Sequence, residues 1–372
     1  MSAYLSAERP LRIIDLTEFY SPRGGVRCHL DMKSDALVRA GHEHWVVAPG
    51  PPENRVKVAD REGATRVVRV GGPSLPYDAN YHLMWRLDRV RCVVERARAD
   101  VLEVNSPYLA MLLARSLRRD QVRARTFFWH ADFVDTYLAP RLGSSRPRER
   151  ILSAVWRGVK KWLDACDAVF ASSEAQAEKL RAHGVSRIVR LQAGVDRRRF
   201  HPGARDETVR RRWLGNRPQA LLLVAAGRLA GEKRWDVVID AFRRFRERHD
   251  AVLVLFGEGP ERERLERRAA GHGDVFFPGF EPDPARLAAA FASADALLHG
   301  CAYETFGLSV AQAGACGTPL IVPAGGAAAA LVDESCGAVY RSLDADAAGA
   351  ALENVFRTPR EVLRDRAARS AE

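Results

Sequence analysis

The sequence predicts an α/β fold with two doubly wound domains, because short apolar runs alternate with amphipathic helical stretches along all 372 residues. A chain of this length exceeds one ordinary hydrophobic core, so two domains are expected. A polar, Arg-rich segment at residues 201–218 separates two series of strands and is interpreted as a linker. The expected domains are therefore residues 1–200 and 219–355, followed by a helix at 356–372 that can pack back on the N-terminal domain.

The expected strands are short, buried runs at residues 11–16, 44–48, 67–70, 101–104, 126–129, 168–171, 221–226, 251–256, 275–277, 296–298 and 319–322. Helical periodicity lies between most of them, for example at residues 27–40, 84–97, 148–164, 234–248 and 285–292. This alternation predicts parallel sheets covered by helices on both faces. Ligands of such sheets bind at the carboxyl ends of the strands, so we expect the functional site in a cleft between two facing domains.

Composition excludes several classes of protein. With 47% hydrophobic and 28% charged residues, the chain is globular rather than disordered. Its formal net charge is +11, and its basic residues are mostly Arg, in clusters such as 197–199, 210–212 and 243–248. These clusters lack interleaved aromatic residues and any nucleic-acid motif, so we expect solvated helix faces and no nucleic-acid partner. An anionic membrane surface or an anionic substrate remains open.

The cysteines and the least charged stretches indicate a cytoplasmic protein. No Cys-x-x-Cys pair occurs among the six cysteines, so free buried thiols are expected rather than disulfides or a metal site. Residues 1–10 lack the apolar core of a signal peptide. The uncharged stretch 305–332 is broken by Pro319 and Pro323, which favours a helix, a buried strand and a turn over a membrane span.

The most informative segment runs from Glu304 to Pro319, after an expected strand. A helix beginning near Phe306 offers unpaired N–H groups that suit a diphosphate, and Gly307 allows close approach to the backbone. The Glu304 carboxylate can hold sugar hydroxyls while the Gln312 amide holds a ribose. The alternative is a capped helix whose Glu only complements the helix dipole.

A second segment supplies the cations that a diphosphate needs. Arg228 and Lys233 follow the expected strand 221–226, where two positive charges can neutralise a departing diphosphate. Taken alone, this segment would be interpreted as a solvated basic loop. Together with the segment at Glu304, it indicates a nucleotide-diphosphate site.

Two weaker signals lie in the first half of the chain. Gly24 and Gly25 occupy an expected strand-to-helix turn, where paired glycines permit close approach to phosphate or sugar. An ordinary tight turn explains them equally well. His130 directly follows the strand 126–129 and can hydrogen-bond a reacting sugar, although a lone histidine is more often structural.

Taken together, these motifs give the chain a family resemblance. The chain resembles the retaining family-4 glycosyltransferases of the GT-B fold, in which two Rossmann-like domains face each other across a cleft. The similar segments occur in the family's order and cover nearly the whole chain. They are Arg23-Gly24-Gly25, His130-Ala-Asp132, Ala193-Gly-Val-Asp196 with Phe200, Gly227-Arg228-Leu229 with Glu232-Lys233, Gly257-Glu-Gly-Pro260, and Glu304 with Phe306-Gly307-Leu308.

The resemblance implies a role for each candidate residue. Gly24 and Gly25 would approach the donor diphosphate, and His130 would lie near the donor sugar and the reacting centre. Two cations, Arg228 and Lys233, would bind the diphosphate. The transferred sugar would be positioned by Glu304, with the backbone of Phe306, Gly307 and Leu308 on the phosphate.

The implied mechanism is front-face displacement, in which the leaving phosphate accepts the acceptor's proton. It uses a nucleotide-diphosphate sugar as substrate and requires neither a cofactor nor a metal. Asp344 and Asp346 have Asp-x-Asp spacing, but they open an Ala-rich helix, where Asp favours the N-terminus.

One position departs from the family pattern. The family usually has a second Glu eight residues after the first, and Gln312 occupies that position here. A neutral amide accepts a ribose hydroxyl hydrogen bond less strongly than a carboxylate does, so donor affinity or nucleotide preference is expected to differ. Arg234 adds a further cation beside Lys233.

Within the family, the pattern is most similar to bacterial phosphatidylinositol mannosyltransferases. The similar stretches are Phe19-Tyr20 before Pro22, Leu75-Pro-Tyr77, Glu103-Val-Asn-Ser-Pro107 and Gly257-Glu-Gly-Pro-Glu-Arg262. This implies GDP-mannose as donor and a lipid-linked or glycan acceptor, with peripheral contact to an anionic membrane. A UDP-sugar donor is the alternative, followed by a nucleotide-sugar epimerase or an inactive donor-binding homologue.

Acceptor contacts, on the family layout, are expected from loops near Tyr20, Tyr81, His82, Asn105 and Tyr108. A helix at 148–164 carries two tryptophans with several basic residues, a composition found in membrane-surface helices. We favour the simpler interpretation, a core helix with a solvated basic face.

Overall fold

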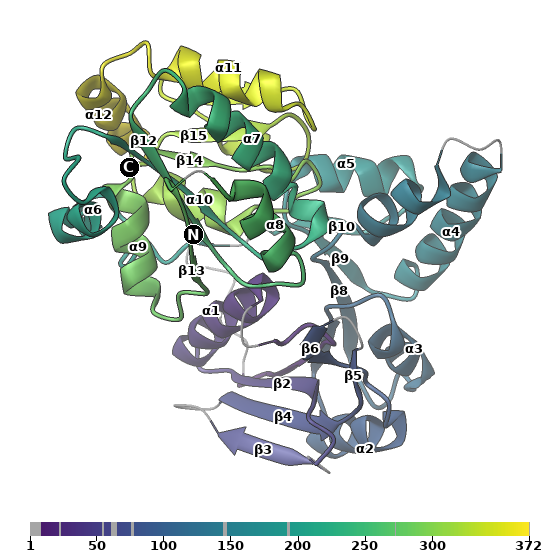
Figure 1. The fold of residues 1–372 in the computed structure, drawn as a ribbon. Helices are drawn as coiled ribbons and strands as arrows, with labels where there is room; N and C mark the ends of the chain where they lie inside the picture. The colour runs from purple at the N-terminus through teal and green to yellow at the C-terminus, as the bar shows by residue number, and fades with distance from the viewer. Residues whose placement is uncertain are drawn as a thin grey trace. The chain divides into compact units, whose positions relative to one another are not determined.

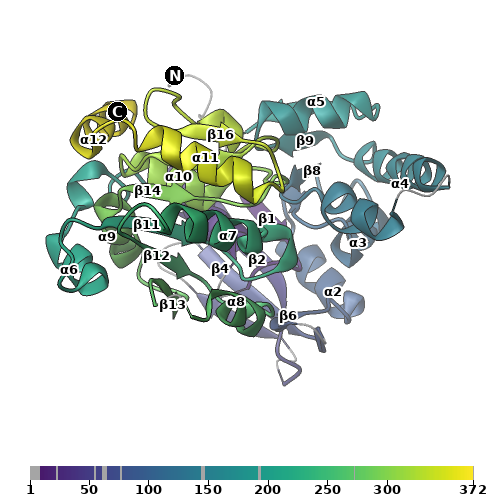
Figure 2. The ribbon, with the colours of Figure 1, turned by 45° about the horizontal axis from the view of Figure 1, so that its top comes forward.

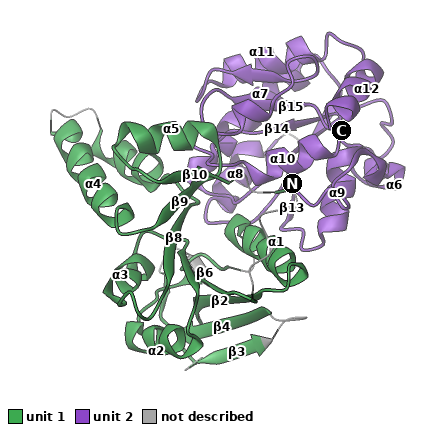
Figure 3. Ribbon diagram, turned by 180° about the vertical axis from the view of Figure 1, so that it is seen from behind, with its two compact units in different colours: residues 1–194 green, residues 195–372 purple. Residues whose placement is uncertain are grey.

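The chain divides into two compact units, residues 1–194 and 195–372 (Figures 1 and 3). This division comes from a computed structural model that describes residues 9–21, 24–53, 56–60, 65–75, 78–143, 147–191, 194–271 and 273–371. The division precedes the expected linker. Residues 201–218 instead contain the helix α6 (Glu207–Leu214), and Leu214 and Phe200 pack in a core of unit 2. The segment interpreted as a linker thus contains a helix, because α6 has an apolar face to bury.

Unit 1 contains the strands β1 (Arg12–Leu16), β2 (Glu43–Gly50), β3 (Lys57–Asp60), β4 (Thr65–Gly71), β5 (Ser74–Leu75), β6 (Asp78–His82), β7 (Val101–Val104), β8 (Ala124–Trp129), β9 (Ala168–Ala171) and β10 (Ile188–Arg190). Its helices are α1 (Gly25–Arg39), α2 (Leu87–Ala97), α3 (Leu109–Ser116), the single-turn helices η1 (Val134–Leu138) and η2 (Ala139–Leu142), α4 (Arg148–Leu163) and α5 (Glu174–Ala182). In the described residues, eight of these strands form one sheet in the order β10-β9-β8-β7-β1-β2-β4-β3. Only the edge strand β3 runs antiparallel to its neighbour in that sheet.

Unit 2 contains β11 (Leu221–Ala226), β12 (Ala251–Phe256), β13 (Val275–Gly279), β14 (Ala296–Leu298), β15 (Leu320–Pro323) and β16 (Ala338–Tyr340). These strands form a parallel sheet in the order β13-β12-β11-β14-β15-β16. Besides α6, the helices are η3 (Pro202–Ala204), η4 (Gly231–Lys233), α7 (Trp235–Arg246), α8 (Arg262–Ala269), α9 (Pro284–Ser293), α10 (Leu308–Ala315), η5 (Ala329–Leu331), α11 (Ala345–Val355) and α12 (Arg360–Ser370).

The strands of unit 2 bury side chains on both faces, as a parallel sheet between helices requires. Leu223 and Leu253 pack with Phe242 of α7 in one core, whereas their neighbours Leu222 and Val252 pack with α9 in the other. On the first face, α7 and α11 lie side by side (Figures 1 and 2). The expected α/β architecture is therefore confirmed in this unit.

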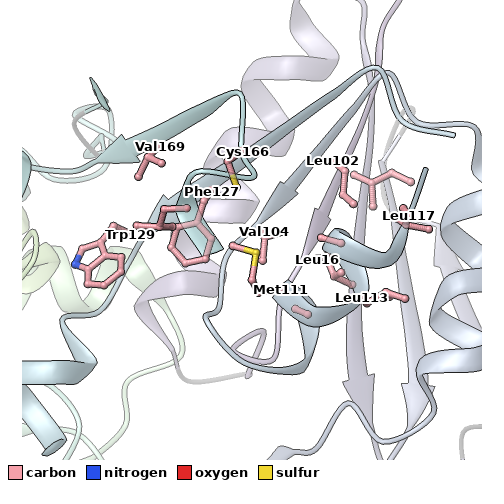
Figure 4. Close-up of a cluster of buried hydrophobic side chains, with 14 of the residues drawn as sticks. Leu16, Leu102, Val104, Met111, Leu113, Leu117, Phe127, Trp129, Cys166 and Val169 are labelled. Carbon is pink, nitrogen blue, oxygen red and sulfur yellow. The ribbon is translucent and has the colours of Figure 1, made fainter. Parts of the chain in front are cut away.

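The core of unit 1 follows the same rule. Leu16, Leu102 and Phe127 come from three adjacent strands and pack with residues of α3 such as Met111 and Leu113 (Figure 4). Burying a side chain of this size contributes about 1.5–3 kcal/mol relative to its exposure. A continuous apolar layer thus fixes the strands whose carboxyl ends carry the candidate residues.

The last helix packs within unit 2. Leu363 and Ala367 of α12 join the core that holds α7. The buried Asp295 carboxylate lies 2.9 Å from Arg210, and Arg360 and Arg364 of α12 approach the same carboxylate at 3.7 and 3.8 Å. These contacts attach the C-terminal helix to the second sheet.

In the part of the chain that the structure describes, no helix is both long enough and apolar enough to cross a bilayer. The uncharged stretch 305–332 contains α10, β15 and a following turn, as expected from its prolines.

Candidate active site

The Lys233–Glu304 ion pair joins the two segments of unit 2 that the sequence singled out. Lys233 ends the short helix η4 after β11, and Glu304 lies in the loop after β14. The Lys233 ammonium donates a hydrogen bond to Glu304 Oε1, and the side chains are 20% and 14% exposed. Burial opposes charge on both groups, but their attraction raises the pKa of Lys233 and holds that of Glu304 below its usual range. Both groups are therefore charged at neutral pH.

Two glycines explain why these loops meet. A methyl group at Gly300 would lie 2.5 Å from the Arg234 carbonyl oxygen and 2.6 Å from that of Lys233. A methyl group at Gly326 would lie 2.8–2.9 Å from backbone atoms of Ala302 and Glu304. Only glycine allows backbones to approach this closely. The loops after β11, β14 and β15 are consequently held together around the ion pair.

Arg228 is the second predicted cation of this site. Its guanidinium donates a 2.6 Å hydrogen bond to Glu232, and the Trp235 indole donates a 2.8 Å hydrogen bond to the Arg228 carbonyl. Trp235 is fully buried, so it fixes the backbone of the loop. The structure thus places Arg228 and Lys233 on one short loop, each with a carboxylate partner.

The predicted phosphate-binding backbone begins the helix α10. Gly307 is the N-cap residue, with φ of 79°, and Leu308 is the first helical residue, so the helix begins two residues later than expected. Phe306 is half-buried just before it. Gln312 lies one turn into the helix and is 8% exposed. The first turn of α10 follows directly on the loop that carries Glu304, and the N–H groups of a first helical turn are unpaired within the helix.

Sequence reasoning missed His299, which lies 3.1 Å from Glu304 through its Nε2 atom. His299 is buried and follows β14 directly. A polar residue after a buried strand was the signal that singled out His130, and the same signal would have identified His299. His299, Cys301 and Glu304 also present possible metal ligands within 4.8 Å of one another. Lys233 already contacts Glu304, and burial, followed by the charge of Glu304, raises the pKa of Cys301 to about 12. A metal ion here would have to compete with the Lys233 ammonium for the Glu304 carboxylate.

The glycine turn of unit 1 is open. Gly24 is the N-cap residue of α1, and a methyl group there would meet the Tyr81 hydroxyl at an ordinary 3.6 Å. A methyl group at Gly25 would meet nothing within 4 Å. Among the described residues, packing requires neither glycine, so the turn has room for a ligand to approach the backbone closely. Arg23 of this motif, with Ala193, Pro22 and Tyr77 of the other motifs, lies outside the described residues.

His130 follows β8, as predicted, and is half-buried. Its ring stacks on Phe128 with centroids 4.2 Å apart, and its Nε2 lies 2.6 Å from Asn105 Oδ1. Burial, reinforced by His29, lowers the pKa of His130 well below its usual range, so the ring is neutral. Acceptor contacts are expected from loops near Asn105, whose own side chain is buried and hydrogen-bonded to Asp15 inside unit 1. The expectation for these loops stays a prediction.

The other expected acceptor residues differ in exposure. Tyr108 is 44% exposed, whereas Tyr20 is buried and its hydroxyl donates to Asp31. Trp156 of α4 is also buried, and it stacks on His183 with centroids 3.8 Å apart. The interpretation of α4 as a core helix is therefore confirmed for its Trp156 face.

The sequence is similar to known glycosyltransferases over nearly its whole length. The profile of the family described as "Glycosyltransferase Family 4" matches residues 23–199, and that of "Glycosyl transferases group 1" matches residues 207–372. A relative from Mycobacterium tuberculosis strain H37Ra is 33% identical over 340 residues, which cover 88% of this chain and 83% of the relative. It is named a GDP-mannose-dependent alpha-(1-6)-phosphatidylinositol dimannoside mannosyltransferase. A GDP-mannose-dependent alpha-mannosyltransferase of Corynebacterium glutamicum is 28% identical and covers 88% and 75% of the two chains.

Solved structures show the same fold. Sucrose-phosphate synthase of Thermosynechococcus elongatus superimposes with a TM-score of 0.79 at 19% identity, covering 97% of this chain and 94% of the other. HepE of Anabaena, solved with UDP and glucose, superimposes with a TM-score of 0.72 at 17% identity and the same coverage. At these identities the likeness is one of fold.

Proposed function

This chain belongs to the retaining family-4 glycosyltransferases of the GT-B fold, and we propose that it transfers mannose from GDP-mannose to a lipid-linked or glycan acceptor. The donor is supported by the two relatives, both of which are named GDP-mannose-dependent alpha-mannosyltransferases. The lipid-linked acceptor is supported by the relative named for phosphatidylinositol dimannoside.

The Lys233–Glu304 pair carries this proposal. A buried carboxylate held in its charged form accepts hydrogen bonds from sugar hydroxyls, and the adjacent ammonium attracts the diphosphate. Arg228 lies on the same loop and adds a second positive charge as the leaving group develops negative charge. The first turn of α10, from Phe306 to Leu308, offers N–H groups to the phosphate, and Gln312 accepts from the ribose.

In unit 1, His130 acts near the transferred sugar, and the open turn at Gly24 and Gly25 approaches the diphosphate. The leaving phosphate takes the acceptor's proton, so no protein nucleophile forms a covalent intermediate. Metal ions are not needed in this scheme, because Arg228, Lys233 and the start of α10 supply the positive charge. The proposal includes no nucleic-acid partner.

We infer peripheral contact with an anionic membrane surface on its cytoplasmic side, because a phosphatidylinositol-type acceptor resides in the bilayer. Arg157 and Lys161 on the exposed face of α4 supply positive charge for such contact. The buried Trp156 does not contribute.

The test compares GDP-mannose with UDP-glucose and UDP-galactose, each with and without a phosphatidylinositol mannoside acceptor in mixed micelles. Release of GDP that depends on the acceptor, with a product heavier by one hexose, supports the proposal. Acceptor-dependent release of UDP would instead assign the alternative UDP-sugar donor.

The remaining alternatives give other products. An epimerase would convert the sugar nucleotide without releasing a nucleoside diphosphate, and an inactive homologue would bind the donor without release. The Glu304→Ala variant, with Arg268→Met as a matched control, ties any activity to this site, because Arg268 pairs with Asp240 elsewhere in unit 2.

A further inference from the structure

A chain of buried hydrogen bonds leads from His130 into the centre of the first sheet. His130 Nε2 lies 2.6 Å from Asn105 Oδ1, and the Asn105 amide nitrogen donates a 2.6 Å hydrogen bond to Asp15 Oδ1. Asn105 and Asp15 are 1% and 0% exposed. Asp15 lies within β1, Asn105 follows β7 and His130 follows β8, so three neighbouring strands contribute.

Asp15 is held as an anion. The Lys33 ammonium of α1 lies 2.8 Å from Asp15 Oδ2 and 2.7 Å from Glu103 Oε1, and His44 contacts Asp15 from β2. Burial opposes the charge, but Lys33 and His44 hold the pKa of Asp15 below its usual range. A charged carboxylate can only accept hydrogen bonds, so every group facing it must donate.

This requirement fixes the orientation of the Asn105 amide. The oxygen and nitrogen of an Asn side chain are distinguished by their hydrogen-bond partners. The amide NH₂ must face the Asp15 anion, and the amide oxygen therefore faces His130. Only a protonated Nε2 can donate to that oxygen. Because the His130 ring is neutral, its other nitrogen, Nδ1, carries the lone pair.

We propose that Asn105 and Asp15 are positioning residues that hold His130 as the tautomer with its proton on Nε2. The ring then offers Nδ1 as a hydrogen-bond acceptor to a hydroxyl group of the bound sugar. Stacking on Phe128, with an interplanar angle of 17°, holds the ring plane. This inference rests on the proposed mannosyl transfer, and it concerns how one residue of that site is prepared for it.

In the same cluster, Ser34 is hydrogen-bonded to His44, and His44 to Asp15. The catalytic triad of many hydrolases has the same three residue types in the same order. Ser34 and His44 are 2% and 0% exposed, so a substrate cannot reach the hydroxyl. His44 contacts Asp15 through Nε2 and Ser34 through Nδ1, so it lies between the buried hydroxyl and the carboxylate. The set therefore supports the Asp15 anion rather than activating a nucleophile.

The test measures the ring nitrogens of His130 by nitrogen-15 NMR in the full chain, with His130→Gln to assign the signals. We expect one protonated nitrogen, Nε2, at neutral pH. A proton on Nδ1 or a cationic ring would overturn the proposal, and this measurement on the unaltered chain is sufficient for that conclusion.

Kinetics of Asn105→Leu then separate positioning from folding. We expect loss of the Nε2–H tautomer and a fall in kcat of at least about tenfold, with the KM for GDP-mannose within about twofold. Ser106→Ala is the matched control, because Ser106 is the next residue, equally buried, and hydrogen-bonds Glu18 instead. A changed tautomer with unchanged kcat contradicts the positioning role.

Should Asn105→Leu not fold, Asp15→Asn provides the second variant, because a neutral amide at position 15 no longer dictates the Asn105 orientation. A mixture of the two His130 tautomers is then expected, and a single unchanged tautomer counts against the proposal. Absence of mannosyl transfer in the unaltered chain would remove the proposed function alone, since the NMR result does not depend on turnover.

Discussion

Both units bury a lysine–carboxylate pair, but they bury it at different depths. In unit 2, Lys233 and Glu304 lie in loops beyond the strands and keep 20% and 14% of their side-chain surface exposed. In unit 1, the Lys33 side chain is 18% exposed, but its partner Asp15 lies within β1 and has no exposed surface. The two lysines are therefore exposed to a similar extent, and the pairs differ in the depth of the carboxylate.

The difference indicates two uses of the same chemistry. A partly exposed pair can exchange its partners for a diphosphate and a sugar when the donor binds, so its charges serve binding. A pair whose carboxylate is fully buried cannot exchange partners, since separating the charges in a low-dielectric interior is costly. Its charges instead fix the hydrogen-bond directions of neighbouring polar groups such as Asn105.

The largest expected effect is on the deeply buried pair. Lys33→Met leaves Asp15 and Glu103 buried without their cation and should lower the free energy of unfolding by about 3–5 kcal/mol. Chemical denaturation measures this change. The control is Lys160→Met, which removes an exposed pair with Asp164 and should cost about 1 kcal/mol or less. Equal losses in the two variants would show that depth does not matter.

The next effect is on turnover. Lys233→Met should lower kcat/KM for mannosyl transfer by about a hundredfold, equivalent to about 2.7 kcal/mol, because one charged contact to the leaving group is lost. Glu304→Ala should lower it by at least about tenfold. Steady-state kinetics, with Arg268→Met as the control, measure both. Rates near that of the unaltered enzyme in both variants would disprove the site.

A smaller effect concerns the pH dependence of stability, which should differ between Glu18 and Glu304. Burial raises the pKa of Glu18 to about 7, although it accepts a 3.0 Å hydrogen bond from the Ala110 N–H. Protonated Glu18 stabilises the fold. This stabilisation is complete below the pKa of about 4.5 that Glu18 has in the unfolded chain, and it is lost as pH rises through about 7. Glu18→Gln should therefore reduce the fall in stability between pH 5 and pH 8 by about 2 kcal/mol, measured by denaturation at both pH values.

Glu304 should behave in the opposite way, which provides the control. Its pKa is held below the usual range by Lys233 and His299, against the effect of burial. Ionised Glu304 therefore stabilises the fold at every pH above its pKa in the unfolded chain. This stabilisation is lost only as pH falls toward the lower pKa of Glu304 in the folded protein. Glu304→Gln should thus leave the pH 5 to pH 8 difference unchanged, and a parallel response of both variants would refute these assignments.

The smallest expected effect is at Gln312. Restoring the family's carboxylate by Gln312→Glu should strengthen donor binding by about 1 kcal/mol, or a few-fold in Kd, if this side chain accepts from the ribose. Calorimetry with GDP measures the change. Weaker binding would indicate that the buried amide has another partner, so that a charge at this position is unfavourable.

Much of the fold, and much of the part of the candidate site that lies in unit 2, could be predicted from local sequence patterns. The bounds of β7, β9, β11, β12 and β14 match the predicted runs, because each is a short run made mainly of apolar residues. The strands β3, β10 and β16 were not predicted, since they are short and lie at sheet edges, where little apolar surface is buried. The helix α6 within the expected linker was not predicted, because it is polar except for the few residues that face the core.

The sequence by itself determined the α/β class, the family and the candidate residues on strand-end loops, because those features depend on residues close together in the chain. Only the tertiary structure decided which distant charges meet. Asp15, Lys33, Glu103 and Asn105 span 90 residues. Asp15 and Glu103 lie in expected strands, but nothing in the local sequence shows that these four side chains meet. Parallel pairing of β1 with β7 brings Asp15 and Glu103 side by side, and α1 places Lys33 over both. Contacts of this kind are set by strand order and register, which no local pattern contains.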